Sequence, residues 1–184
     1  MPGDSKRARF EREVLPHLDA AYNLARWLLR NGEDAADATQ DACFRAYKYF
    51  DGFHGGDAKA WLLKIVRNSC YSWLKNNPKG EALDADADGR LDPEHERALA
   101  AAGQRPASPE ALLLAKADRA LLSEGLDGLP AAYREVLVLR EIEELSYKEI
   151  SAIAGIPIGT VMSRLARARA LLQQRLASRL RDGA

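Results

Sequence analysis

Residues 145–180 read LSYKEISAIAGIPIGTVMSRLARARALLQQRLASRL, and this stretch predicts two helices joined by a short turn. Ser146 and Glu149 have the spacing of a reciprocal capping pair at a helix start. Gly155 suits the left-handed position that ends a helix, and Pro157 fits the first turn of the next one. A helix, a glycine-containing turn and a second helix are the pattern of a DNA-reading helix-turn-helix.

The second of these helices, from about residue 158, has two different faces at about 100° per residue. Its apolar stripe comprises Val161, Leu165, Ala168, Leu172 and Leu176. The opposite face carries Gly159, Thr160, Ser163, Ala166, Arg167, Ala170 and Gln174, with Arg164 and Arg169 on the flanks. Small residues let a helix approach a groove, and Ser, Thr and Arg bond phosphates or base edges. Residues 157–181 hold six arginines and no acid. The alternative is an ordinary amphipathic helix with a solvated basic face.

The composition predicts a helical protein without a metal or cofactor. The chain has 184 residues and is rich in Ala and Leu. It has no long apolar run and no signal peptide, so we expect a soluble, cytoplasmic protein without membrane insertion. Cys43 and Cys70 lack metal or redox spacing, and the three histidines are scattered. The formal net charge of zero conceals an acidic middle and a basic C-terminal helix.

The fold class expected is all-α, with two small helical domains joined by a flexible acidic linker. Helices are expected at about residues 5–31, 34–49 and 58–77, and they would form a first domain at 1–78. In the first of these helices we expect a kink or restart at Pro16, a core face that includes Tyr22, and a stop at Asn31-Gly32. Residues 79–108 are rich in Gly, Pro and acids, which is typical of a linker. The second domain, residues 109–184, would contain helices at 109–127 and 130–143 before the helix-turn-helix.

The helix at 34–49 carries an acidic strip, which we define as Asp34, Asp37 and Asp41. Gln40 and Phe44 lie at its edge. Clustered carboxylates beside an exposed aromatic ring suit docking onto a basic protein surface. The alternative is a solvated face on which an Asp41–Arg45 pair contributes about 0.3 kcal/mol.

The helix at 58–77 has a packing side and a second, mixed side. The packing side comprises Leu62, Val66, Ser69, Cys70 and Trp73. The mixed side, here the aromatic–basic arc, comprises Trp61, Lys64, Asn68, Tyr71 and Lys75. Bases stack on aromatic rings, lysines follow phosphates, and an amide can bind an extruded base, so this arc suits single-stranded DNA. The preceding loop, residues 53–57, would wall the pocket. The alternative places Trp61 in the core and the lysines in solvent.

Three stretches, in this order, resemble the bacterial extracytoplasmic-function sigma factors of the sigma-70 superfamily. DAADATQDACFRAYKYF, residues 34–50, looks like the segment that grips the β′ clamp helices of RNA polymerase. FHGGDAKAWLLKIVRNSCYSWLKN, residues 53–76, looks like the segment that melts the −10 promoter element. LPAAYREVLVLREIEELSYKEISAIAGIPIGTVMSRLARARALL, residues 129–172, is similar to the −35-binding domain.

The resemblance implies a transcription initiation factor that is not an enzyme. Its partners would be core RNA polymerase, at the β′ clamp helices and the β flap, promoter DNA, and an anti-sigma factor. Polymerase contacts would come from Asp34, Asp37, Gln40, Asp41 and Phe44. Contacts to the −10 element would come from Phe53, His54, Trp61, Lys64, Asn68, Tyr71 and Lys75. Contacts to the −35 element would come from Gly159, Thr160, Ser163, Arg164 and Arg167.

Two departures from the family pattern affect what the resemblance implies about promoter sequence. Met162 stands where family members commonly carry Arg or Lys, which removes a phosphate or base contact. The loop before Trp61 is about one residue shorter than in the commonest pattern, so the flipped-base preference does not carry over.

Three other classes of protein account for fewer of these sequence features. A dimeric helix-turn-helix regulator explains residues 145–180, but it leaves the acidic strip and the aromatic–basic arc without a role. A helical adaptor would bind protein alone, without the salt dependence of DNA binding. For an enzyme, the sequence offers no nucleophile–base set, metal spacing or phosphate loop.

Overall fold

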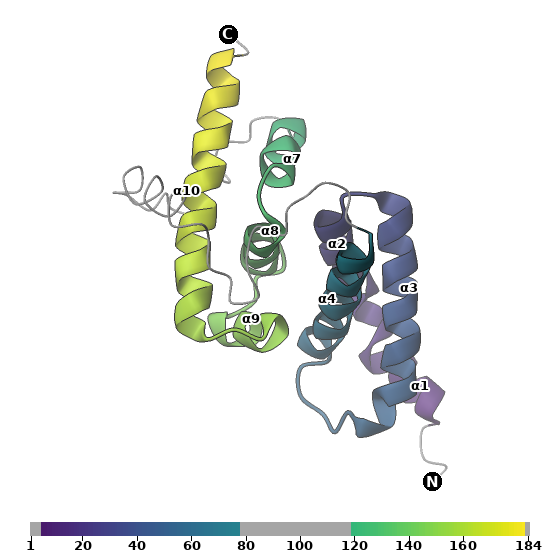
Figure 1. The fold of residues 1–184 in the computed structure, drawn as a ribbon. Coiled ribbons are helices and arrows are strands. Elements are labelled where there is room, and N and C mark those ends of the chain that lie inside the picture. Colours follow the sequence, from purple (N-terminus) through teal and green to yellow (C-terminus); the bar gives the residue numbers. More distant parts are fainter. Residues whose placement is uncertain (1–4, 78–118, 183–184) are drawn as a thin grey trace. The chain divides into compact units, whose positions relative to one another are not determined.

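The structure is a computed structural model that describes residues 5–77 and 119–182, and these residues form helices and no strand (Figure 1). They divide into two compact units. One holds residues 5–77 and 148–156, and the other holds 119–147 and 157–182. The expected linker at 79–108, and the first part of the helix expected at 109–127, lie outside the described residues.

Three helices pack against one another in the first unit: α2 (Leu18–Leu29), α3 (Gly32–Tyr49) and α4 (Ala58–Asn76). The face that α3 buries consists of alanines, Ala35, Ala38, Ala42 and Ala46. Such small side chains allow the neighbouring helices to come close. Helix α1 (Lys6–Glu13) and the 3-10 turn η1 (Leu15–His17) precede α2. Pro16 lies in the first turn of η1, so the expected interruption of the helix at Pro16 is confirmed.

The core face of α2 and the start of α3 differ from the sequence-based expectation. The buried residues of α2 are Ala21, Leu24, Ala25, Leu28 and Leu29, whereas Tyr22, which we expected in the core, is 38% exposed. Helix α3 begins at Gly32 rather than at Asp34, because the Asn31 side chain accepts hydrogen bonds from the N–H groups of Glu33 and Asp34. Arg30, with φ of 57°, takes the left-handed position that ends α2.

The α3–α4 connection comprises the 3-10 turn η2 (Phe50–Gly52) and a loop that ends at Asp57. The Asp57 Oδ1 accepts a hydrogen bond of 3.1 Å from the Ala60 N–H and so caps α4. Partial burial raises the pKa of this carboxyl, but the hydrogen bonds that it accepts lower the pKa by more than burial raises it. The pKa of Asp57 therefore lies below its ordinary value.

We expect Asp57→Ala to lower the free energy of unfolding by about 1 kcal/mol at neutral pH, because the first turn of α4 loses its cap. A lowered pKa in the folded state means that this contribution is complete above about pH 4 and is lost as the pH falls through the folded-state pKa. Urea denaturation at pH 7 and at acid pH measures the difference. Asp57→Asn keeps an acceptor and should stay close to the wild type, and equal losses in both variants would contradict the capping role.

The second unit contains α7 (Arg119–Asp127), α8 (Ala131–Leu137), the π-helical turn η3 (Val138–Ile142) and α10 (Ile158–Asp182). Helix α10 packs against α7 and α8. Its stripe residues Val161, Leu165, Ala168 and Leu172 are buried, as the sequence predicted. A Cβ on Gly125 would lie 2.9 Å from Leu172 Cδ1, so this glycine lets α7 approach α10 closely.

The helix expected over residues 130–143 is not α-helical throughout. It changes to the π-helical turn at Val138, where the Glu143 N–H donates to the Val138 carbonyl. Arg140 Nη1 donates to the Leu145 carbonyl at 2.8 Å, and the Arg140 guanidinium lies 4.8 Å from the centre of the Tyr147 ring. Arg140 therefore links the π-helical turn to the start of α9 (Tyr147–Ala154).

The helix, turn and helix predicted from residues 145–180 are confirmed. Helix α9 ends at Ala154, and Gly155 follows with φ of 68°, which is the left-handed conformation that the sequence required. The N–H groups of Gly155 and Ile156 both donate to the Ser151 carbonyl. Helix α10 then begins at Ile158, directly after Pro157.

Candidate nucleic-acid and protein interfaces

Helix α3 presents most of the acidic strip to solvent. Asp37, Gln40, Asp41 and Phe44 are exposed, Phe44 by 68%, while Asp34 is half-buried. Asp41 Oδ2 lies 3.0 Å from Arg45 Nε, which is the ion pair of the alternative interpretation. Both side chains of the pair are more than half exposed, so it contributes at most a few tenths of a kcal/mol. The pair therefore leaves the strip available for an intermolecular contact.

Helix α4 separates its packing side from the aromatic–basic arc. Leu62, Val66, Ser69 and Cys70 are buried, as expected. On the arc, Lys64, Asn68 and Lys75 are exposed, whereas Trp61 and Tyr71 are half-buried. The guanidinium of Arg67 lies 4.0 Å from the centre of the Tyr71 ring, a contact that the sequence reasoning did not include although the two residues are four apart. Arg67 therefore adds a positive charge beside the arc.

The first residue of the loop before α4, Phe53, is buried, whereas the sequence suggested that it faces DNA. Phe53 is 7% exposed, and its ring stacks on Phe50 with the ring centres 5.9 Å apart. The Trp61 ring centre lies 4.9 Å from that of Phe53. Phe53 thus belongs to an aromatic core cluster, and Trp61 lies between this cluster and solvent. His54 is exposed, and Gly55 and Gly56 have φ values of 92° and 106°.

The face of α10 opposite the apolar stripe carries most of the residues that the sequence assigned to it. Gly159 and Ser163 are exposed, and Thr160 and Arg167 are half-buried. Arg164 is 6% exposed, so in this structure it is not on the surface where a promoter contact was expected. The position of Arg164 in the helix explains its burial. It lies three residues after Val161 and four before Ala168, so it borders the buried stripe.

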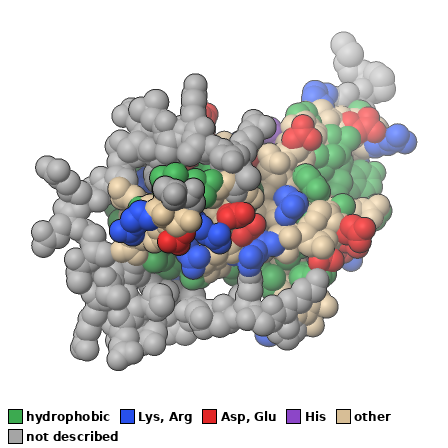
Figure 2. All heavy atoms as spheres, turned by 90° about the horizontal axis from the view of Figure 1, so that it is seen from above, with side chains coloured by type: hydrophobic (Ala, Val, Ile, Leu, Met, Phe, Trp, Pro, Cys, Tyr) green, Lys and Arg blue, Asp and Glu red, His purple; other side chains and the backbone are tan. Residues whose placement is uncertain are grey.

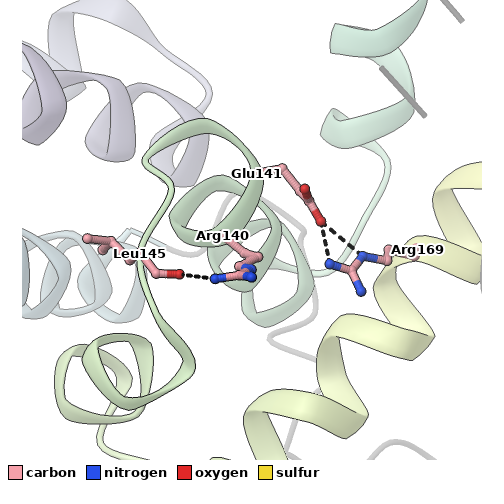
Figure 3. Close-up of polar contacts among 4 residues, drawn as sticks. All are labelled: Arg140, Glu141, Leu145 and Arg169. Carbon is pink, nitrogen blue, oxygen red and sulfur yellow. Dashed lines mark hydrogen bonds and ion pairs between the residues drawn. The ribbon is translucent and has the colours of Figure 1, made fainter. Parts of the chain in front are cut away.

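Arg169, which the sequence placed on the flank of the same face, is bonded within the protein instead. Figure 3 shows Arg169 of α10 and Glu141 of η3 pointing toward one another. Arg169 Nε lies 3.0 Å from Glu141 Oε1, and the side chains are 13% and 19% exposed. This ion pair fixes α10 to η3.

Charged side chains of both signs are interspersed over the face that Figure 2 presents. Within residues 5–77 and 119–182, no group of three His, Cys, Asp or Glu side chains is placed to hold a metal ion. The helices of this described part include none of the length and apolarity that a bilayer crossing requires.

Comparison with known proteins matches both parts of the chain. The family described as Sigma-70 region 2 matches residues 14–79, and Sigma-70, region 4, matches residues 119–172. The ECF RNA polymerase sigma-E factor of Escherichia coli K12 is 33% identical over 145 residues, which cover 78% of this chain and 74% of that protein. The chain belongs to the extracytoplasmic-function (ECF) RNA polymerase sigma factors.

Further relatives agree with this assignment. The ECF sigma factor SigE of Mycolicibacterium smegmatis is 34% identical over 166 residues, which are 89% of this chain, and the chain spans 60% of that relative's length. The sigma factor RpoE of Bartonella quintana, solved in complex with the anti-sigma factor NepR, is 29% identical with a TM-score of 0.67. That match covers 91% of this chain and 96% of that one.

The family places the candidate surfaces of this ECF sigma factor in two different regions. Region 2 covers α2 to α4, with the acidic strip and the aromatic–basic arc. Region 4 covers α7 to α9 and the first half of α10. A dimeric helix-turn-helix regulator would account only for the second of these matches and is therefore disfavoured.

Proposed function

We propose that this sigma factor binds core RNA polymerase in the cytoplasm, directs it to promoters through their −10 and −35 elements, and assists melting of the −10 element. The polymerase supplies the catalysis, and the sigma factor performs no covalent chemistry itself. The observation that carries the proposal is the exposure of the acidic strip and of the polar side of α4 on separate helices of region 2.

We assign one role to each surface. The acidic strip, with Gln40 and Phe44, docks on the β′ clamp helices, the aromatic–basic arc with His54 holds the opened −10 strand, and α10 meets the −35 element. Region 4 also contacts the β flap. The domains are residues 1–78 and 109–184, with 79–108 as a tether. A single module buries little DNA surface, but polymerase makes the second DNA contact intramolecular.

An anti-sigma factor is a further proposed partner. The Bartonella quintana relative is described in complex with one, NepR. Its counterpart here would cover surfaces that polymerase or promoter DNA otherwise occupies.

A run-off transcription assay tests the proposed function. It combines the purified chain, bacterial core polymerase and a pool of promoter fragments from the source genome. We expect specific transcripts that require the added chain. A chain that binds a palindromic site as a dimer, and yields no transcripts with polymerase, would instead be a conventional regulator.

Arg167→Ala should weaken recognition of the −35 element by about 1–3 kcal/mol if the guanidinium contacts a base. Holoenzyme binding to promoters with single −35 substitutions measures this, because a lost base contact removes discrimination at one position. A lost phosphate contact would instead weaken all sequences equally and lower the salt dependence. Arg181→Ala, an exposed arginine near the end of α10, is the matched control.

Asn68→Ala should impair promoter melting and leave polymerase binding unchanged, because the exposed amide lies on the arc that receives the opened strand. Permanganate footprinting of unpaired thymines measures melting, and a template with a pre-opened −10 bubble should restore transcription. Asn76→Ala, on the last turn of α4, is the control. Equal losses of polymerase binding in Asn68→Ala and Arg167→Ala would contradict the division of roles.

A further inference from the structure

The first turns of α10 expose an apolar strip, which we define as Ile158, Met162 and Ala166. Ile158 is 44% exposed and Met162 is 51% exposed, and Ala166 is also in solvent. Their four-residue spacing places them along one side of the helix. This side is separate from the buried stripe of Val161 and Leu165, so core packing does not account for it.

The surroundings of the apolar strip favour DNA as the group that covers it. Gly159 and Ser163 beside it are small and exposed, which permits a close approach. Between residues 157 and 181 the chain has six arginines and no acid. Arg164 is buried and Arg169 pairs with Glu141, but the other four arginines leave α10 positive, which favours a polyanion. The first residues of the second helix in a helix-turn-helix are also those that enter the major groove.

The chemistry of the strip limits what it can recognise there. Ile158, Met162 and Ala166 offer no strong donor or acceptor for the hydrogen-bonding edges of bases. The apolar group in the major groove is the 5-methyl of thymine, which apolar side chains contact. Methionine has three rotatable bonds and a polarisable sulfur, so Met162 can adjust to such a methyl group.

We propose that Met162, flanked by Ile158 and Ala166, reads thymine methyl groups in the −35 element. At the base pair that Met162 contacts, the sigma factor then distinguishes promoters by an apolar contact and not by a hydrogen bond. The inference rests on the proposed function and deepens it, because it names a specificity-determining residue and its chemical target.

Uracil substitution tests the inference at the level of one methyl group. The −35 element is first selected from a random library by transcription with the holoenzyme. Each thymine of the selected element is then replaced singly by uracil, which lacks only the 5-methyl. For the wild-type protein we expect about a fourfold loss of promoter affinity at one or two positions, the effect of one buried carbon. Met162→Ala should abolish this loss.

Two further variants define the controls. Leu180→Ala removes a 58% exposed apolar side chain from the other end of α10 and should keep the wild-type response to uracil. Met162→Arg should lose the response to uracil and gain a preference for guanine, which arginine binds through two hydrogen bonds.

The outcomes that overturn the inference differ from those that overturn the proposed function. A selected −35 element without thymine, or a response to uracil that persists in Met162→Ala, overturns the inference alone. The absence of any wild-type transcript that depends on the added chain overturns the proposed function and the inference with it.

Discussion

Phe44→Ala is expected to weaken binding of the sigma factor to core RNA polymerase by about 2 kcal/mol or more, which is about thirtyfold in Kd. The ring is 68% exposed at the edge of the acidic strip, so it is free to fill a pocket on the partner. Its removal should leave the fold intact, because the buried face of α3 consists of alanines. Fluorescence anisotropy with labelled sigma factor and purified core polymerase measures the affinity.

Tyr49→Ala is the matched control for this variant. Tyr49 is 60% exposed and lies on the same helix, but it is five residues further on and so faces another direction. Its loss should change the affinity little. Equal weakening in both variants, or none in Phe44→Ala, would show that the acidic strip is not the polymerase-binding surface.

Arg134→Met is expected to lower the free energy of unfolding of region 4 by about 3 kcal/mol. Arg134 is fully buried, and its Nη1 donates to the carbonyls of Leu129 and Asp127 at the end of α7. Methionine keeps most of the apolar contact but leaves these buried acceptors without their charged donor. A cation at this end also stabilises α7 through the helix dipole.

Urea denaturation with hydrogen exchange detects and locates this effect. Amide protection should fall in α7, α8 and α10 while α2 to α4 keep theirs. Arg181→Met makes the same chemical change at an exposed site and should alter stability by no more than about 0.5 kcal/mol. Unchanged protection of α7 and α8 in Arg134→Met would contradict the role assigned to Arg134.

The elements that the sequence predicted best are those whose signals are local. Pro16, Gly155 and Pro157 restrict the backbone at their own positions, so helix breaks could be placed from them alone. The stripe of α10 was predicted because its apolar residues repeat at the helical period. The start of α3 was predicted two residues too late, because Asn31, which follows the end of one helix, also caps the next.

Side chains at the border of a helical face were harder to assign. Arg164 is basic, which favours exposure, but it also borders the apolar stripe, which favours burial. The sequence does not show which of the two prevails, and in the structure the side chain is buried. Phe53 was assigned to a DNA-facing loop, although it stacks in an aromatic cluster whose members are brought together by the fold. The Arg169–Glu141 pair joins residues 28 apart, so no local pattern could indicate it.

Under the proposed function, that pair also bears on how accurately the sigma factor can read a promoter. Helix α10 is about 38 Å long, and Thr160 lies about 13 Å along its axis from Arg169. If the helix turned about the Arg169–Glu141 attachment by about 10°, the end that we propose faces DNA would move by about 2 Å, enough to break a hydrogen bond to a base. We therefore expect the attachment, together with the buried stripe of α10, to limit how far the proposed DNA-reading tip can move.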